Sequence, residues 1–338
     1  MGDYRLSLCI PTYNFGPFIG ETLQSIRRQI TPQVQVVVLD GGSTDNTREV
    51  VEAYGRDMPG LRYTRQDMRG GIDRDISRVV GLSAGEYSWL FSSDDVIRPG
   101  AIRRVLQEIE GGCDLYLLGR MECTLRMRPI RKTPVLALGA ETEFELSDEM
   151  DRSRYFSKAE GTYALFAYMS SLVFRKARWD AVPLDERYVG SCWAHVARIF
   201  AMIPKGLRVK YVSDALVWCR RDNDSFLSGS VARRMGLTVR GYQRMGREFF
   251  GGGSLEDLAI RRALRKEHRI WNLLALKAKA RRSSDKEDLR QLRWEVGALY
   301  DGPPGSNAIG RLLYDLAPAF LLDPAYRIYK TLTSILGY

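Results

Sequence analysis

Three polar clusters follow apolar, strand-like runs in the first third of the chain. They are Pro11–Asn14, Asp40–Asp45 and Ser92–Asp95. Ligands of open α/β sheets bind beyond the carboxyl ends of the strands, so we expect these clusters to meet at one edge. The adjacent carboxylates of Asp94 and Asp95 are costly there unless a cation offsets their charge. A hard divalent ion that also holds phosphate oxygens fits this pattern; the alternative is a pair of solvated loop acids.

The elements that must position these clusters are short strands alternating with helices. Helix capping is expected from Ser43 or Thr44, just before the second helix. This order of elements indicates βαβ units and a mainly parallel sheet. The predicted strands are 6–10, 34–39, 61–65 and 87–91, and the predicted helices are 18–30, one from about 46, 75–82 and 99–109.

The pattern changes after residue 112. Strand-like runs at 115–118, 172–174 and 215–218 are separated by longer irregular segments, and the chain reads as helical beyond residue 230. We therefore predict a catalytic domain over 1–228, with a nucleotide-binding half (1–112) and an acceptor half (113–228). A helical, basic, membrane-associated region is predicted over 229–338.

The net charge is +10 over 338 residues, and the excess lies mainly in the Lys- and Arg-rich stretch 231–282. Such an excess suits an acidic partner: phosphates, nucleic acid or an anionic membrane. The alternative is a solvated helix face. Five cysteines without a CxxC pair favour neither a disulfide framework nor a thiolate zinc site, and fit reduced thiols in the cytosol.

Membrane contact is expected at the surface only. No signal peptide precedes the strand-like run from Leu6, and no apolar run approaches the ~20 residues that span a bilayer. The segment 312–338 mixes aromatic and aliphatic residues with Arg327 and Lys330, which suits an interfacial segment on anionic lipid. The alternative is packing on the protein itself or in an oligomer contact.

Three ordered segments resemble family 2 inverting glycosyltransferases of the GT-A kind. They are LSLCIPTYNFGPFIGETLQSI, VVVLDGGSTDNT and GLSAGEYSWLFSSDDVIRPGAI, and the resemblance covers residues 5–110, with a looser match over 160–225. GGIDRD at 70–75, GSCWAHVARIF at 190–200 and RRDNDSF at 220–226 look like the abequosyltransferase-type enzymes of O-antigen assembly. The resemblance implies an α/β GT-A fold, a Rossmann-like, mainly parallel sheet with flanking helices, followed by a C-terminal helical region.

The resemblance also implies where the nucleotide binds. Pro11, Thr12 and Tyr13 would border the base, and Asp40 would face the base or ribose. Asp40 matches the first acid of the family's DDGS motif, whereas Gly41 replaces the second acid. Because of this departure, the sequence does not select among CDP, UDP, TDP and GDP.

The phosphate end of the donor is implied in the same way. Asp94 would contact ribose or metal-bound water, and Asp95 would ligate Mn²⁺ or Mg²⁺ bridging the two phosphates. Arg74 is a candidate phosphate contact, with a surface arginine as the alternative. Arg221 is a second candidate, with a polar turn as the alternative.

Inverting transfer needs a general base to deprotonate the acceptor hydroxyl. The family usually supplies an acid from an ED pair, but alignment on Arg198 places Ser191 and Cys192 at those positions. His195 follows Cys192 by about one helical turn, and we predict His195 as the base or an acceptor-binding residue. The alternatives are a packed histidine, or Asp185 or Glu186 as the base.

Together these features predict a metal-assisted inverting glycosyltransferase. It would move a sugar from a nucleoside-diphosphate sugar to a polyprenyl-diphosphate-linked saccharide in O-antigen-like assembly, peripherally on the cytoplasmic face of the membrane, with an oligomer allowed. A nucleotidyltransferase is the alternative, but PTYNFGPF lacks the basic residue of its phosphate loop. Nucleic-acid binding is disfavoured, because it gives the strand-end Asp94–Asp95 pair no role.

Overall fold

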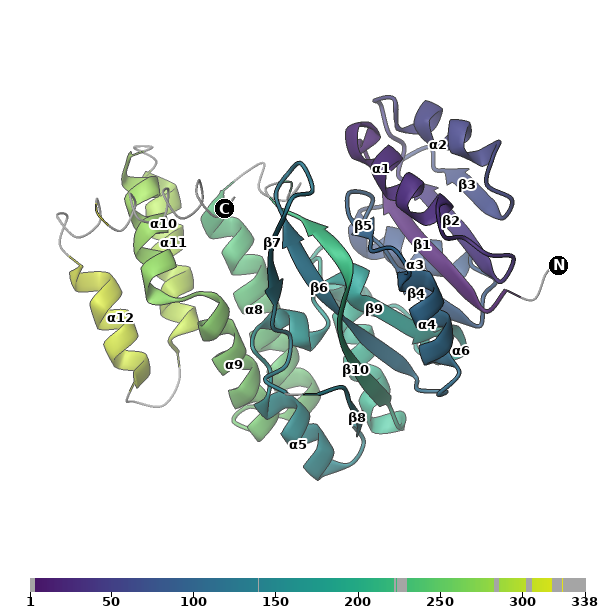
Figure 1. The fold of residues 1–338 in the computed structure, drawn as a ribbon. Helices are drawn as coiled ribbons and strands as arrows, with labels where there is room; N and C mark the ends of the chain where they lie inside the picture. Colours follow the sequence, from purple (N-terminus) through teal and green to yellow (C-terminus); the bar gives the residue numbers. More distant parts are fainter. Residues whose placement is uncertain are drawn as a thin grey trace. The chain divides into compact units, whose positions relative to one another are not determined.

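The chain folds as two compact units in a computed structural model (Figure 1). One unit comprises Met1–Lys158 and Tyr163–Arg220, and the other Ala159–Thr162 and Arg221–Tyr338. The structure describes residues 4–138, 140–221, 223, 230–282, 286–301, 306–317 and 324.

A mixed sheet forms the centre of the first unit, in the order β3-β2-β1-β4-β9-β6-β10-β5, with β7 beside β6 and β8 beside β10. The first four strands in this order are parallel neighbours, and β9 then pairs antiparallel with both β4 and β6. The strands are β1 (Leu6–Thr12), β2 (Val34–Asp40), β3 (Leu61–Arg65), β4 (Tyr87–Leu90), β5 (Val96–Ile97), β6 (Leu115–Cys123), β7 (Pro129–Thr133), β8 (Thr142–Glu145), β9 (Leu172–Arg175) and β10 (Arg208–Arg220).

Helices flank this sheet and connect its parallel strands. Those of the first unit are α1 (Gly16–Arg27), α2 (Thr47–Gly55), α3 (Ile72–Gly81), α4 (Ala101–Ile109), α5 (Glu149–Ser157), α6 (Lys176–Asp180) and α7 (Ala194–Met202). The expected α/β architecture, a mainly parallel sheet with flanking helices, is confirmed. The later strands do not form a separate layer, because β9, β6 and β10 extend the same sheet.

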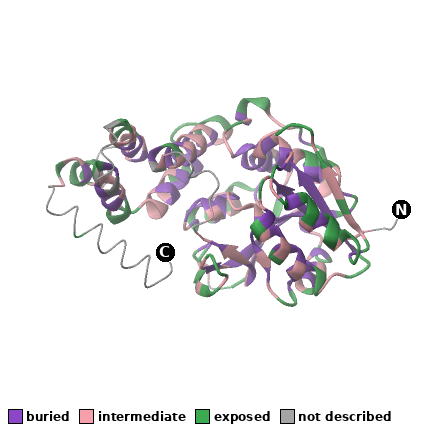
Figure 2. Ribbon diagram, turned by 90° about the horizontal axis from the view of Figure 1, so that it is seen from above, coloured by how far each residue is buried: buried purple, intermediate pink, exposed green. Residues whose placement is uncertain are grey.

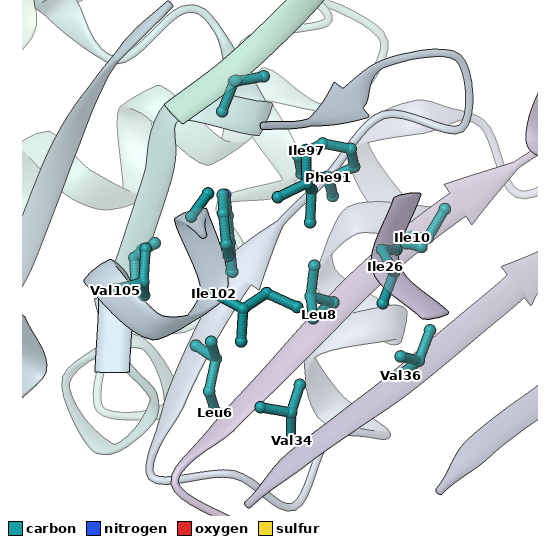
Figure 3. Packing of buried hydrophobic residues seen from close by; sticks show 14 of the residues in the cluster. Leu6, Leu8, Ile10, Ile26, Val34, Val36, Phe91, Ile97, Ile102 and Val105 are labelled. Atoms are coloured by element: carbon teal, nitrogen blue, oxygen red, sulfur yellow. The ribbon is translucent and has the colours of Figure 1, made fainter. Parts of the chain in front are cut away.

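The core explains why the first strands read as continuous apolar runs. Alternate residues of β1, Leu6, Leu8 and Ile10, face a cluster that includes Ile26 of α1 and Ile102 of α4 (Figure 3). The opposite face of β1 and β2 is covered by α3. Strands buried on both faces have no polar side to alternate. Accordingly, every residue of β1, β2 and β4 is buried, and the centre of the sheet is purple in Figure 2.

Local predictions near the helix starts needed correction. The predicted cap of α2 by Ser43 or Thr44 is wrong: the Ser43 hydroxyl donates to Asp40 instead, at 2.7 Å, and Asp45 accepts from the Thr47 amide at 3.0 Å. Helix α3 begins at Ile72, three residues before the predicted start. The run at 215–218 is only the end of the 13-residue strand β10.

The second unit is helical in its described parts. Its helices are α8 (Val231–Phe250), α9 (Leu255–Glu267), α10 (Ile270–Arg282), α11 (Lys286–Leu299) and α12 (Ser306–Leu316). The serine hydroxyls of Ser230 and Ser254 cap α8 and α9 by accepting from amides of their first turns. Over the described residues, none of the helices combines the length and apolarity needed to cross a bilayer.

Candidate active site

The first two polar clusters meet at the carboxyl ends of β1 and β2. Thr12 pairs with Asp40 in the parallel register, and the Gly41 amide donates to the Thr12 carbonyl at 2.9 Å. Asp40 is fully buried. Its Oδ1 accepts from the amide and hydroxyl of Ser43, and its Oδ2 accepts from the Tyr63 hydroxyl at 2.7 Å. Asp40 therefore fixes the turn after β2 and ties it to β3.

The loop after β1 lies against this turn. Pro11 is buried within β1, and the Thr12 hydroxyl is buried with no hydrogen-bond partner among the described residues. The Tyr13 ring is half-buried, and the Arg69 guanidinium stacks over it, 4.2 Å from the ring centroid. An aromatic ring and an unpaired hydroxyl at a strand end suit a nucleoside, since both can contact a planar base or a sugar.

The third cluster holds two buried carboxylates after β4. Asp94 is 7% exposed and accepts from the Ser92 hydroxyl. Asp95 is 2% exposed; its Oδ2 accepts from the hydroxyls of Tyr168 and Ser170, and its Oδ1 from the Arg220 amide at 3.0 Å. Burial, together with the neighbouring charge of Asp94, raises the pKa of Asp95 to about 7. The site thus places negative charge where burial opposes it.

Arg220, at the end of β10, offsets part of this charge. Its Nε donates to the Asp94 carbonyl at 2.8 Å, and its guanidinium pairs with Glu21 of α1 at 2.6 Å. The side chain is only 2% exposed. The Thr22 hydroxyl, also from α1, donates to the Asp95 carbonyl at 2.7 Å. Hydrogen bonds from both β10 and α1 therefore fix the backbone of Asp94 and Asp95 after β4.

Behind Asp95 lies a second buried arginine. Arg120 of β6 is 2% exposed, and its guanidinium lies 3.4 Å from the Tyr163 ring centroid and 4.7 Å from that of Tyr168. Burial and the charge of Asp95 raise the pKa of Tyr168, so this phenol stays a hydrogen-bond donor to Asp95. Arg120 thus stacks on the residue that holds the carboxylate.

His195 lies in the first turn of α7 and is 4% exposed. Neither ring nitrogen makes a hydrogen bond of good geometry within the described residues. Burial lowers the pKa of His195, whereas Asp73 and the nearby backbone of Ala167 and Phe166 favour its protonated form. The imidazole is therefore neutral at pH 7 and faces groups that would stabilise a proton once it arrives.

Asp73 of α3 positions the start of α7. Its carboxylate accepts from the backbone amides of Gly190, Cys192 and Ala194, at 2.8, 3.0 and 3.0 Å. The expectation that Cys192 and His195 share a helix face is wrong, because Cys192 precedes α7 and has a φ of +69°. The physical reason is that the hydrogen bonds to Asp73 hold residues 190–194 in a turn, so that the helix begins only at Ala194.

The remaining predicted residues make other contacts. Both guanidinium nitrogens of Arg74 bind Glu186 at 2.8 Å, on the protein surface. Asp185 pairs with Arg187 at 2.6 Å. Arg221 belongs to the second compact unit, and Asn223 is the one described residue of 222–229. The structure therefore brings together Thr12, Tyr13 and Asp40 at one strand edge and Asp94 and Asp95 at the next strand end, and it engages Arg74 elsewhere.

Comparison with known proteins shows the family of this chain. The family model described as "Glycosyl transferase family 2" matches residues 7–174. Over 299 residues, the chain is 30% identical to abequosyltransferase RfbV of Salmonella typhimurium, with 86% of this chain and 89% of that protein covered. The chain belongs to glycosyl transferase family 2.

Other known proteins are similar to this glycosyltransferase in sequence or in fold. The GalNAc(5)-diNAcBac-PP-undecaprenol beta-1,3-glucosyltransferase of Campylobacter jejuni is 25% identical over 55% of this chain and 57% of its own. S. aureus TarS 1-349, solved with UDP-GlcNAc, superposes with a TM-score of 0.63 at 19% identity, covering 98% of this chain and 91% of that one. The mannosyltransferase PcManGT of Pyrobaculum calidifontis, solved with GDP-Man and Mn²⁺, gives a TM-score of 0.52 at 17% identity, covering 99% and 85%. The predicted GT-A fold and glycosyltransferase family are confirmed.

The strand-end acids of this glycosyltransferase fit a divalent cation. No group of three His, Cys, Asp or Glu side chains forms a metal cage in the described part of the chain. Mg²⁺-like ions bind through one or two carboxylates together with substrate phosphates and water, so a full cage is not needed. Asp95 Oδ1 receives one hydrogen bond, from Arg220, and keeps a second lone pair for a cation.

Several residues of the site escaped prediction. Asp73 lies in the GGIDRD segment, and nothing in that segment predicts its contact with the loop before α7, more than 110 residues later. Arg220 adjoins the predicted Arg221, and only the pairing of β10 places it beside Asp94. Tyr168 precedes a short 3₁₀ turn with no sequence signal, since its contact with Asp95 spans 73 residues of chain.

Proposed function

We propose that this protein is an inverting glycosyltransferase that moves a sugar from a nucleoside-diphosphate sugar to a hydroxyl of a lipid-linked saccharide in bacterial surface-polysaccharide assembly. The observation that carries the proposal is the buried Asp94–Asp95 pair at the end of β4, beside the polar ends of β1 and β2. The similarity to abequosyltransferase RfbV over 86% of the chain supports the transfer of a sugar.

The donor would bind across the strand ends. Thr12, Tyr13 and Asp40 would border the nucleoside, and the diphosphate would extend toward Asp94 and Asp95. TarS and PcManGT, which share the fold, were solved with UDP-GlcNAc and GDP-Man respectively. Arg74 and Arg221 are proposed phosphate contacts; for Arg74 this requires exchanging Glu186 for the phosphate, which its exposed position allows.

Asp95 would hold Mn²⁺ or Mg²⁺, with Asp94 beside it at the ribose or at metal-bound water. When bound, the ion supplies positive charge that offsets the charge developing on the departing nucleoside diphosphate. The chain's own part is to present an ionised, fixed carboxylate: the hydroxyls of Tyr168 and Ser170 hold one oxygen and leave the other directed by the Arg220 amide.

His195 would act as the general base. Its imidazole is neutral at pH 7, so Nε2 or Nδ1 can take the proton of the acceptor hydroxyl as the acceptor oxygen bonds to the anomeric carbon. The bond from that carbon to the diphosphate oxygen breaks on the opposite side, and its electron pair leaves with the nucleoside diphosphate. Asp73 would stabilise the imidazolium that forms.

The acceptor would be a polyprenyl-diphosphate-linked saccharide at an anionic membrane surface on the cytoplasmic side. The printed name of the Campylobacter jejuni relative contains such a lipid, PP-undecaprenol. In the second unit, α12 exposes four apolar side chains: Ile309, Leu312, Leu313 and Leu316. An open cavity of about 540 Å³ next to them is lined by Arg290, Arg293, Arg311 and Trp294, among others. Most of the predicted tail, 318–323 and 325–338, lies outside the described residues.

A ligand screen tests the proposed function directly. We expect one nucleoside-diphosphate sugar with Mn²⁺ or Mg²⁺ to raise the melting temperature, because ligands that bind only the folded state stabilise it by mass action. The same donor should then support transfer to a short-chain polyprenyl-diphosphate saccharide, with inversion at the anomeric carbon detected by NMR. No stabilisation by any nucleotide sugar in the presence of metal, or transfer with retention, would contradict the proposal.

A further inference from the structure

Gly41 occupies the position where the family motif has its second acid, and the backbone does not require glycine there. Among the neighbouring glycines, Gly42 has a φ of +86°, whereas Gly41 is outside the left-handed region. A Cβ at residue 41 would lie 3.3 Å from Oδ2 of Asp75, 3.5 Å from the Thr12 carbonyl oxygen and 3.7 Å from Cβ of Tyr13. The space beside Gly41 is therefore closed by a carboxylate from another element.

That carboxylate belongs to Asp75 of α3, and the residues just before this helix leave room for it. A Cβ at Gly70 would lie only 2.6 Å from Oδ1 of Asp75, so residue 70 must also lack a side chain. Two glycines from separate loops thus face the two oxygens of one carboxylate. Gly71, with a φ of +83°, then turns the chain into α3.

The carboxylate is held on one oxygen only. Gln66 donates to Asp75 Oδ1 at 2.7 Å, and Gln66 in turn accepts from Arg78. No donor within the described residues binds Oδ2, although Asp75 is only 5% exposed. A buried carboxylate ordinarily accepts several hydrogen bonds, because each unmet one carries a desolvation cost. The oxygen that lacks a donor is the one nearest the Cβ position of residue 41, a point that also lies close to Thr12 and Tyr13.

We propose that Asp75 takes over the role of the missing second acid and accepts a hydrogen bond from the nucleoside of the sugar donor. The inference rests on the proposed function. It makes Asp75 the residue that selects among the nucleotides of possible sugar donors. Its ligand chemistry is an N–H of the base or a hydroxyl of the ribose, placed between Tyr13 and the turn after β2. The acid has moved from the β2 turn to α3, while its oxygen stays in the same space.

A compensation experiment tests this exchange in the full-length protein. Affinity for CDP, UDP, TDP and GDP in the presence of Mn²⁺ is measured by calorimetry for Asp75→Ala, Gly41→Asp and the double variant. We expect Asp75→Ala to weaken binding of the preferred nucleotide at least ~10-fold, the loss typical of a hydrogen bond to a charged group. Gly41→Asp alone should also weaken binding, because it crowds Asp75. The double variant should recover most of the affinity, since an acid again fills the space.

The controls separate this inference from the proposed function and from misfolding. Glu49→Ala removes an exposed acid from α2 and should bind like the unmodified protein. Affinity for Mn²⁺-pyrophosphate should be unchanged in Asp75→Ala, which reports an intact phosphate site. A 2′-deoxynucleoside diphosphate that binds the unmodified protein and Asp75→Ala equally well identifies the ribose hydroxyl as the lost partner, whereas a changed order among the four bases identifies the base.

Three results would contradict the role of Asp75, the exchange of acids or the proposed function. If the unmodified protein binds a nucleotide and Asp75→Ala binds it equally tightly, the role of Asp75 is wrong and the proposed function stands. If the double variant binds no better than Asp75→Ala while Mn²⁺-pyrophosphate binding is retained, the exchange of acids is wrong. If the unmodified protein binds none of the nucleotides, the proposed function itself fails.

Discussion

Individual residues of this site carry charge where the surroundings disfavour it. Asp95 is buried beside Asp94, and the donors that hold its carboxylate come from two separate parts of the chain: Tyr168 with Ser170, and Arg220. His195 is buried in its neutral form. Titratable groups whose pKa values are strongly displaced by burial and by specific neighbours cluster at functional sites.

The raised pKa of Asp95 predicts a pH dependence of stability. An acid whose pKa rises on folding, here from 3.8 to about 7, binds more protons when folded than when unfolded. Its contribution to stability is complete below the unfolded pKa and is lost as the pH rises through about 7. We expect metal-free protein to lose melting temperature between about pH 4 and about pH 7, and Asp95→Asn to flatten that loss.

The same ionisation controls ligand binding with the opposite sign. Stabilisation by Mn²⁺ with the nucleotide should grow as the pH rises through about 7, because a metal ligand must be deprotonated. Melting curves at a series of pH values, with and without Mn²⁺ and nucleotide, measure both effects. An Asp95→Asn variant that keeps the full slope and the full metal response would show that Asp95 is neither the titrating group nor the metal ligand.

His195 predicts a kinetic effect without a binding effect. Because general-base catalysis contributes roughly 10²–10⁴-fold, His195→Gln should lower kcat by that factor while nucleotide affinity persists. Since burial lowers its pKa below 6.5, kcat should be level above neutrality and fall only on the acid side, and His195→Gln should remove that fall. His268→Gln changes the other histidine and serves as the control. A kcat within about threefold of the unmodified enzyme would rule out His195 as the base.

At the scale of elements, helix α3 contributes one carboxylate near the proposed base and another near the proposed nucleoside site. Asp73 and Asp75 are two residues apart, which places their side chains on different sides of an α-helix. Asp73 accordingly caps the loop before α7 and faces His195, whereas Asp75 reaches the turn after β2. One helix therefore links the proposed base to the proposed nucleoside contact, and its register fixes both.

Helix α12 predicts where lipid contact would occur. Its exposed apolar residues follow the spacing i, i+3, i+4 and i+7, which forms one stripe along a helix, while Tyr314 faces the interior. Replacing Leu312 and Leu313 with Glu should reduce flotation with anionic vesicles at least several-fold, because it removes apolar area and adds repulsion. Leu255→Glu, on the exposed start of α9, is the matched control.

The vesicle experiment has a clear contrary result. If the α12 variant floats like the unmodified protein, or if Leu255→Glu reduces flotation equally, then α12 is not the lipid-binding face. Neutral vesicles should bind less than anionic ones, since Arg290, Arg293 and Arg311 lie beside this stripe.

At the scale of the whole molecule, the two units divide the proposed work. The first unit contains the mixed sheet with its polar strand ends, both acids of the pair, and helix α7 with the proposed base. The second contains the basic and exposed apolar helices that would meet the membrane. A net charge of +10 suits a reaction in which donor, acceptor and surface are all anionic.

The sequence by itself determined the parallel strands of the first third of the chain and the position of the acids that follow them. Strands that are buried on both faces, such as Val34–Leu39, are continuous apolar runs that can be recognised from the sequence alone. Asp94 and Asp95 come shortly after another such strand. The order of strands and helices along the chain was therefore enough to place the three polar clusters at one edge of the sheet. Helix starts were less certain, because Ser43 could cap a helix or hold Asp40, and only packing chooses between these.

Only the tertiary structure decided which side chains meet across the chain. Asp75 lies beside Gly41, Arg220 beside Asp94 and Tyr168 beside Asp95, through contacts that no short-range period encodes. The reason is physical: each contact depends on the register of a helix or strand against the sheet, and that register is set by the summed packing of the core. The sequence showed that an acid was missing at residue 41, and the fold showed that α3 brings another carboxylate into the same space.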